Sequence, residues 1–86
     1  MRKFLILLAG IMIAPPAFAA TVTNKDDVQR TLVVTESGAR SELVLGVGES
    51  LEFCDGGCFV TMPNGDREAL SGGETIEISG GRAVFK

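Results

Sequence analysis

The feature that most constrains the fold is a repeated alternation of short apolar or β-branched runs with turn-forming residues, which extends from Thr21 to Lys86. Turn formers interrupt these runs at intervals of about eight to ten residues, a spacing typical of small sandwiches and barrels. Apolar residues recur with period two inside the runs, and no run shows helical periodicity. The pattern therefore predicts an all-β domain, a small antiparallel β-sandwich or barrel of about seven to eight short strands.

The same alternation indicates where the strands lie and which side chains share a face. Period two places Leu32 and Val34 on one face of a strand and directs Ile76 and Ile78 inward. Asn64-Gly65 predicts a type I′ turn, which needs positive φ at both central residues. The expected strands are residues 21–23, 28–36, 41–45, 50–54, 58–62, 67–70, 75–79 and 82–85.

Residues 1–19 have the features of a targeting segment rather than of a folded element. Arg2-Lys3 form a positive n-region, residues 4–13 an apolar stretch, and Ala17-Phe18-Ala19 a small-x-small signal peptidase site. We therefore expect a signal peptide over residues 1–19, cleavage between Ala19 and Ala20, and one domain over residues 20–86. A retained transmembrane anchor would need about 20 apolar residues, and Pro15-Pro16 interrupts this stretch too early. The expected location is the periplasm or the extracellular space.

Removal of the signal peptide makes the remaining chain distinctly acidic. The whole chain has eight basic and eleven acidic residues; without Arg2 and Lys3, six basic residues remain and the net charge becomes −5. An acidic surface repels phosphate backbones and anionic lipid, so we expect no nucleic-acid partner and no stable membrane insertion of the mature chain. A domain this small buries only about 60% of its unfolded surface, so its stability depends on a covalent link or a partner.

Cys54 and Cys58 are the expected covalent link. The intervening Asp55-Gly56-Gly57 suits a three-residue hairpin loop between two strands, and in an oxidising compartment a disulfide across the hairpin neck follows. In that register Phe53 would pair with Phe59 on the opposite face. A disulfide that closes so small a loop stabilises the fold by about 2 kcal/mol in the chain-entropy model.

Two other interpretations of the cysteines stay open. Reduced Cys54 and Cys58 could bind Cu(I) together with Met62, or Zn²⁺ together with Asp55. They could also act as a thiol-redox pair, although redox pairs use Cys-x-x-Cys at a helix N-terminus and the flanks here are strand-like.

Catalysis is not indicated by the composition. The chain contains no histidine, so none of its serines has the usual activating base. The adjacent carboxylates of Asp26 and Asp27 could serve as acid and base in principle, but adjacent acidic residues in a turn are usually solvated. We therefore expect a protein that is not an enzyme and that uses no cofactor.

Two stretches of sequence carry a family resemblance. Thr21-Val-Thr-Asn24-Lys-Asp26, followed by Gly46-Val-Gly48-Glu49-Ser50-Leu-Glu-Phe53, resembles the early strand and the copper-loop strand of cupredoxins. The resemblance implies a sandwich shape. It does not extend to copper, because a type 1 site needs two histidines and a cysteine. The chain is also similar to small periplasmic proteins of Gram-negative bacteria, a likeness that implies no particular activity.

Two function classes follow from these observations. The first is an exported binding or interaction module that recruits a protein or peptide through a sheet face or an unpaired edge strand. The last strand, with charges at Arg82 and Lys86 that discourage promiscuous pairing, is the candidate edge, and two copies could also dimerise by covering an edge. The second class is a periplasmic soft-metal or thiol-redox protein that uses Cys54 and Cys58.

Overall fold

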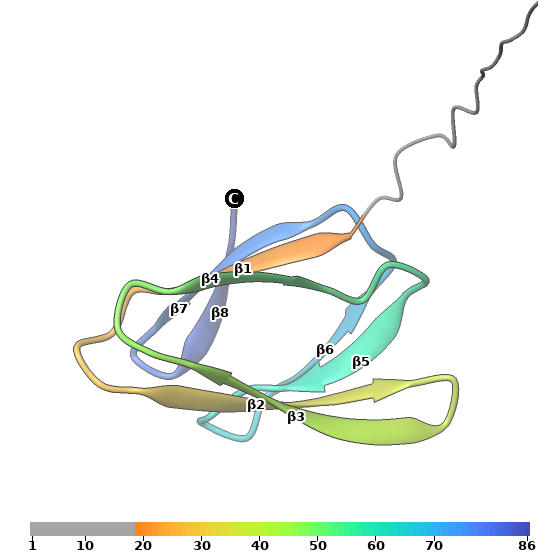
Figure 1. Ribbon diagram of the computed structural model, residues 1–86, viewed down its shortest axis with the longest axis horizontal. Helices are drawn as coiled ribbons and strands as arrows, with labels where there is room; N and C mark the ends of the chain where they lie inside the picture. The colour runs from red at the N-terminus through yellow and green to blue at the C-terminus, as the bar shows by residue number, and fades with distance from the viewer. Residues whose placement is uncertain (1–18) are drawn as a thin grey trace, which may run out of the picture.

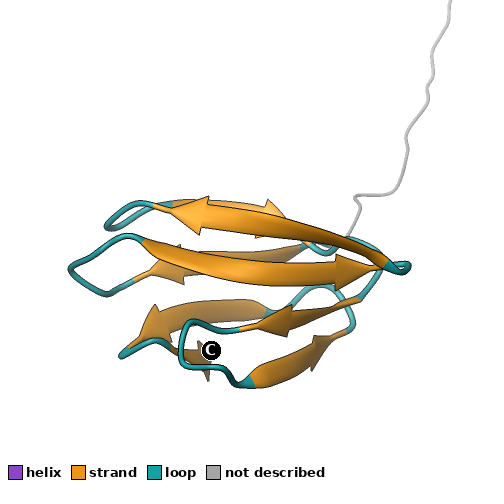
Figure 2. Cartoon of the chain, turned by 90° about the horizontal axis from the view of Figure 1, so that it is seen from below, coloured by secondary structure: helices purple, strands orange, loops and turns teal. Residues whose placement is uncertain are grey.

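The computed structural model describes residues 19–86, so the predicted signal peptide lies outside the described residues except for Ala19. Eight strands form two four-stranded sheets that pack as two layers (Figures 1 and 2). Sheet A has the strand order β4-β1-β7-β8, and sheet B has the order β3-β2-β5-β6. The strands are β1 (Ala20–Asn24), β2 (Arg30–Glu36), β3 (Ala39–Leu45), β4 (Ser50–Phe53), β5 (Cys58–Thr61), β6 (Arg67–Leu70), β7 (Thr75–Ser79) and β8 (Arg82–Phe85).

The all-β prediction is confirmed, and the two sheets are mainly antiparallel, as expected, with one parallel pair that the prediction did not include. Strands β1 and β7 pair in parallel, with Val22 opposite Ile76, and the other pairs are antiparallel. Parallel neighbours need a crossover connection rather than a hairpin. The chain between β1 and β7 supplies one, because it passes through β2 and β3 of sheet B, returns to sheet A as β4, and passes through β5 and β6 of sheet B before β7.

The core lies between the two sheets and is made by every second residue of the strands. Leu32 and Val34 of β2 face Ile76 and Ile78 of the opposite sheet across this core, so the predicted faces are confirmed. Leu43, Leu51, Phe53 and Ala83 are partly buried and pack against the same cluster. The buried apolar residues are Ala20, Val22, Leu32, Val34, Leu45, Cys54, Cys58, Val60, Met62, Leu70, Ile76 and Ile78.

The tight turns differ from the prediction in their location. Positive φ at two consecutive residues, the mark of a type I′ turn, occurs at Ser37-Gly38, at Gly72-Gly73 and at Gly80-Gly81. The predicted type I′ turn at Asn64-Gly65 is wrong, since φ is positive at Gly65 but not at Asn64. Pro63 has its φ fixed near the value that a type I turn needs, and the Gly65 amide accordingly donates to the Met62 carbonyl at 2.8 Å.

The predicted hairpin between β4 and β5 is also wrong. Strand β4 pairs with β1, so Phe53 lies opposite Ala20, whereas Phe59 on β5 pairs with Thr35 and Ala69. Phe53 and Phe59 are therefore not a cross-strand pair. Residues 54–57 carry the chain from one sheet to the other, which lets both strands turn an apolar face to the shared core.

Both sheets have open edges. The prediction that the last strand is an edge strand is confirmed, since β8 ends sheet A and, among the described strands, pairs with β7 alone. Strand β4 ends the same sheet on the other side, and β3 and β6 are the edges of sheet B.

Candidate functional site: a groove between two edge strands

A groove of about 440 Å³ lies between β4 of sheet A and the neighbouring β2 and β3 of sheet B. Its apolar surface comes from Val34, Leu43 and Phe53, which are inward-facing positions of three different strands. These side chains reach the groove because β3 and β4 are both edges, so no further strand of residues 19–86 closes the sandwich on this side. The groove is thus an uncovered margin of the hydrophobic core.

Carboxylates surround this apolar surface. Glu36 at the end of β2 and Asp55 in the turn after β4 line the groove, and Glu52 lines it at the edge of β4, where strand alternation turns its side chain to the outer face. Among the described residues that line it there is no lysine or arginine. Three carboxylates with no basic residue beside them in this lining give the groove a negative potential next to its apolar surface.

The remaining lining residues tie the groove to the ends of the chain and to the disulfide. Ala19 lines it, and Ala20 is fully buried at the start of β1. The predicted cleavage site therefore falls at one end of the groove. Ser41 and Cys54 complete the wall.

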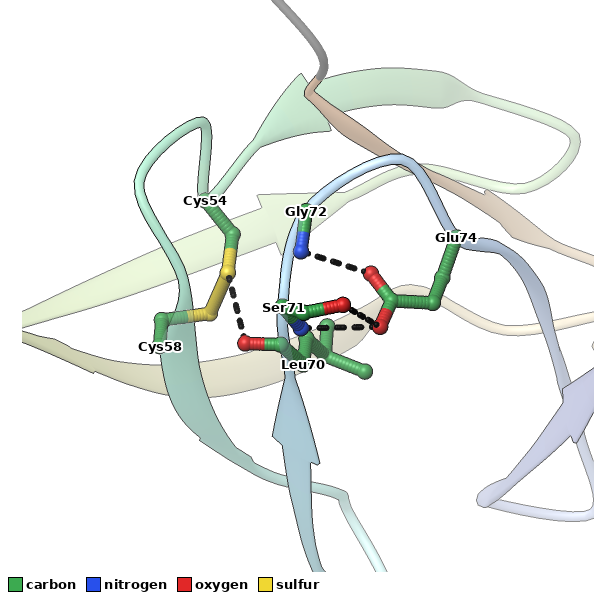
Figure 3. The surroundings of a disulfide bond; sticks show 6 residues. All are labelled: Cys54, Cys58, Leu70, Ser71, Gly72 and Glu74. Atoms are coloured by element: carbon green, nitrogen blue, oxygen red, sulfur yellow. Dashed lines mark hydrogen bonds between the residues drawn. A yellow bond between two sulfur atoms is a disulfide. The ribbon is translucent and has the colours of Figure 1, made fainter.

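Cys54 and Cys58 form the predicted disulfide, with their Cα atoms 5.5 Å apart. Its position differs from the prediction, since it joins the end of β4 in sheet A to the start of β5 in sheet B (Figure 3). Cys54 lines the groove, and Cys58 lines a second hollow of about 420 Å³ that also includes Phe59. The bond therefore fixes the corner of the sandwich that ends the groove.

A carboxylate closes the neighbouring turn between β6 and β7. Glu74 accepts hydrogen bonds from the Ser71 amide at 2.8 Å, the Ser71 hydroxyl at 3.0 Å and the Gly72 amide at 2.8 Å (Figure 3). The Ser71 amide is the main reason that the pKa of Glu74 lies below its ordinary value of 4.5. The carbonyl oxygen of Leu70, at the end of β6, lies 4.0 Å from the Cys54 sulfur. This contact is not a hydrogen bond, because the disulfide sulfur carries no proton.

Asn24 and Asp26 hold the opposite end of the sandwich together. Asn24 is fully buried and donates to the carbonyl oxygens of Val28 at 2.8 Å, Leu45 at 3.2 Å and Gly46 at 3.2 Å. Its own side-chain oxygen accepts from the Asp26 amide at 3.0 Å. One side chain thus links β1 to two other loops.

The Asp26 carboxylate is a structural acceptor rather than a solvated group. It accepts from the amides of Gly80 at 2.7 Å and Gly81 at 3.0 Å, and from Arg30 at 2.8 Å. These two amides, with Arg30, keep the pKa of Asp26 below its ordinary value of 3.8. Asp27 is exposed, so the two adjacent carboxylates considered as an acid and base pair have different surroundings.

The residues considered as metal ligands do not converge. Cys54 and Cys58 are in the disulfide, Asp55 is exposed, and Met62 is buried just past the other end of β5. Four residues of extended strand separate Cys58 from Met62 by about 13 Å. Within residues 19–86, no group of three or more His, Cys, Asp or Glu side chains is placed to hold a metal ion.

Comparison with protein-family models, curated proteins and solved structures found no match to this chain. The part of the chain that the structure describes also contains no helix long and apolar enough to cross a membrane.

The sequence alone did not indicate the groove. Its residues come from four separated segments that meet only when β4 pairs with β1 and leaves the side of β2 and β3 uncovered. Nothing in the sequence around Glu36 and Glu52 separates them from the other acidic residues, and only the folded structure places them at the groove. The one sequence feature that could have indicated the groove is Phe53, a large apolar residue directly before the polar turn that begins at Cys54.

Proposed function

We propose that this protein is an exported, non-enzymatic binding module whose groove takes a protein or peptide segment that carries basic and apolar side chains. The observation that carries this proposal is the groove itself, where Glu36, Glu52 and Asp55 border the apolar surface of Leu43 and Phe53 with no basic residue among the described lining. Peptide sites of this kind obtain affinity from apolar burial and selectivity from charge.

Export to the periplasm or the extracellular space is part of the same proposal. Two observations support it: the first described strand starts at Ala20, the residue that the predicted cleavage would expose, and the described residues contain a disulfide. Structural disulfides persist in oxidising compartments. The cupredoxin resemblance enters the proposal only as a sandwich shape, since Asn24 and Asp26 of the shared motif hold loops together.

A titration followed by NMR tests the binding role. The exported, oxidised, 15N-labelled protein is titrated with the peptide acetyl-Thr-Val-Lys-Val-Thr-amide, and separately with its counterpart in which glutamate replaces lysine. We expect the lysine peptide to shift the amide resonances of Val34, Leu43 and Phe53 and the glutamate peptide to leave them unchanged. Shifts with neither peptide, or equal shifts with both, would contradict the proposal.

Charge variants give the matched control. Glu36→Gln, Glu52→Gln and Asp55→Asn together remove three charges from the groove and are expected to abolish the lysine-dependent shifts. Asp27→Asn, Glu68→Gln and Glu77→Gln remove the same number of charges elsewhere. We expect this second triple variant to bind as the wild type does, because net charge alone does not make the site.

A further inference from the structure

We propose that the ligand binds as an additional antiparallel strand along β4, hydrogen-bonded to the backbone of Ser50 and Glu52. This inference rests on the proposed function and specifies its mode of binding. It follows from the backbone groups that the β1–β4 register leaves without a partner, and from the side chains that lie on each side of that edge.

The direction of the β1 amides decides which groups of β4 are used. In an antiparallel pair, residues whose N–H and C=O groups face the partner alternate with residues whose groups face away. The Asn24 amide donates toward the β4 side, to Glu49 O at 2.9 Å, and the Thr21 amide donates toward the β7 side, to Glu74 O at 2.8 Å. The even-numbered residues of β1 therefore direct their backbone groups to β4.

The register then identifies the free groups. Val22 pairs with Leu51, and two residues further along β4 the next hydrogen-bonded position is Phe53. Leu51 and Phe53 use their backbone groups on β1, so those of Ser50 and Glu52 point to the open side. Among the strands of residues 19–86, β4 has no neighbour other than β1. Each of these two residues thus offers one donor and one acceptor to an added strand.

The side chains beside this edge specify the sequence of the added strand. Ligand residues opposite Leu51 and Phe53 would point into the groove, where Val34 and Leu43 provide apolar contacts. The ligand residue opposite Glu52 would lie on the outer face beside that carboxylate, since directly opposed side chains on one face interact. The site therefore favours an extended segment in which a basic residue stands between two apolar residues.

The β8 edge and a second copy of the chain are poorer candidates. Strand β8 carries Arg82, and Lys86 follows it; Lys86 pairs with Glu77 at 3.8 Å, so a basic ligand gains nothing there. A dimer through β4 would bring two sets of the same three carboxylates together, because each copy contributes Glu36, Glu52 and Asp55. Charge repulsion therefore disfavours pairing of β4 with β4 of a second copy, whereas a strand with a basic residue is attracted to it.

N-methylated peptides test strand addition directly. In acetyl-Thr-Val-Lys-Val-Thr-amide, the lysine N–H is the group that would donate to β4, whereas the valine N–H groups point away from it. We expect N-methylation of the lysine to weaken binding roughly tenfold or more, and N-methylation of either valine to change it by less than about threefold. Equal effects of the two modifications would overturn strand addition.

Amide hydrogen exchange and a variant separate this inference from the proposed function. The Glu52 amide is expected to exchange more slowly with the peptide bound, and Glu52→Gln to weaken binding while the lysine and valine N-methyl peptides still differ. Groove shifts without slower Glu52 exchange would refute strand addition and leave the groove as a binding site. Loss of all groove shifts with the unmodified peptide would refute the proposed function itself.

Discussion

Replacement of Asn24 by alanine should destabilise the domain more than any single surface change, because the Asn24 side chain is fully buried and both of its N–H groups and its oxygen are hydrogen-bonded, with three carbonyl oxygens sharing the two N–H groups. Each such bond contributes about 1 kcal/mol net. Three of the four contacts lie in part-buried surroundings, where water can replace the lost partner, so no further penalty is added for them. We therefore expect Asn24→Ala to lower the free energy of unfolding by about 3 kcal/mol.

That loss is large for a domain of this size. At about 0.05–0.15 kcal/mol per residue, the whole domain is stable by about 3–10 kcal/mol. The midpoint of thermal unfolding should fall by about 12–24 °C. The chain has no tryptophan or tyrosine, so unfolding is best followed by far-UV circular dichroism, in urea at neutral pH.

Asn64 provides a matched control within the same chain. Like Asn24, it accepts through its side-chain oxygen from the amide two residues later, here Asp66 at 3.0 Å, but it is exposed. Asn64→Ala should therefore cost less than about 1 kcal/mol, because solvent replaces its partners. Equal losses for Asn24→Ala and Asn64→Ala, or a loss below about 0.5 kcal/mol for Asn24→Ala, would refute the role given to burial.

Two further predictions concern the disulfide and the Asp26 carboxylate. Cys54→Ala with Cys58→Ala should lower the free energy of unfolding by about 2 kcal/mol in a urea titration, and a reductant should then have no effect on the variant. The pKa of Asp26 lies below 3.8, so the stability that its carboxylate provides is present above that pH and is lost as the pH falls through the lowered folded-state pKa. The difference in free energy of unfolding between wild type and Asp26→Asn should accordingly narrow from about pH 6 to about pH 3, and a constant difference would contradict this assignment.

Periodicity predicted the strands well because it reports burial, which the two-layer packing satisfies directly. Leu32, Val34, Ile76 and Ile78 face the core as the alternation required. Periodicity does not report partners. The parallel contact of β1 with β7 joins segments about fifty residues apart, and no local pattern in either strand specifies it.

Local turn chemistry was a weaker guide, because neighbouring residues compete to set the backbone. Asn64-Gly65 has the composition of a type I′ turn, yet Pro63 imposes the φ of a type I turn one residue earlier. The type I′ geometry occurs instead at Ser37-Gly38, where the serine takes φ 51° between two paired strands. A hairpin whose strands already pair can hold a residue in a conformation that its own preference disfavours.

The cysteine spacing shows the same ambiguity with a functional consequence. A separation of four residues fits a hairpin neck and also fits a corner between two layers, since either brings the Cα atoms within bonding range. A hairpin would have placed β5 on the free edge of β4. The corner instead sends β5 to the opposite sheet and leaves β4 paired on one side only. The backbone of Glu52 and the apolar surface beside Phe53 are exposed for this reason, so the misassigned turn is the same feature that creates the candidate site.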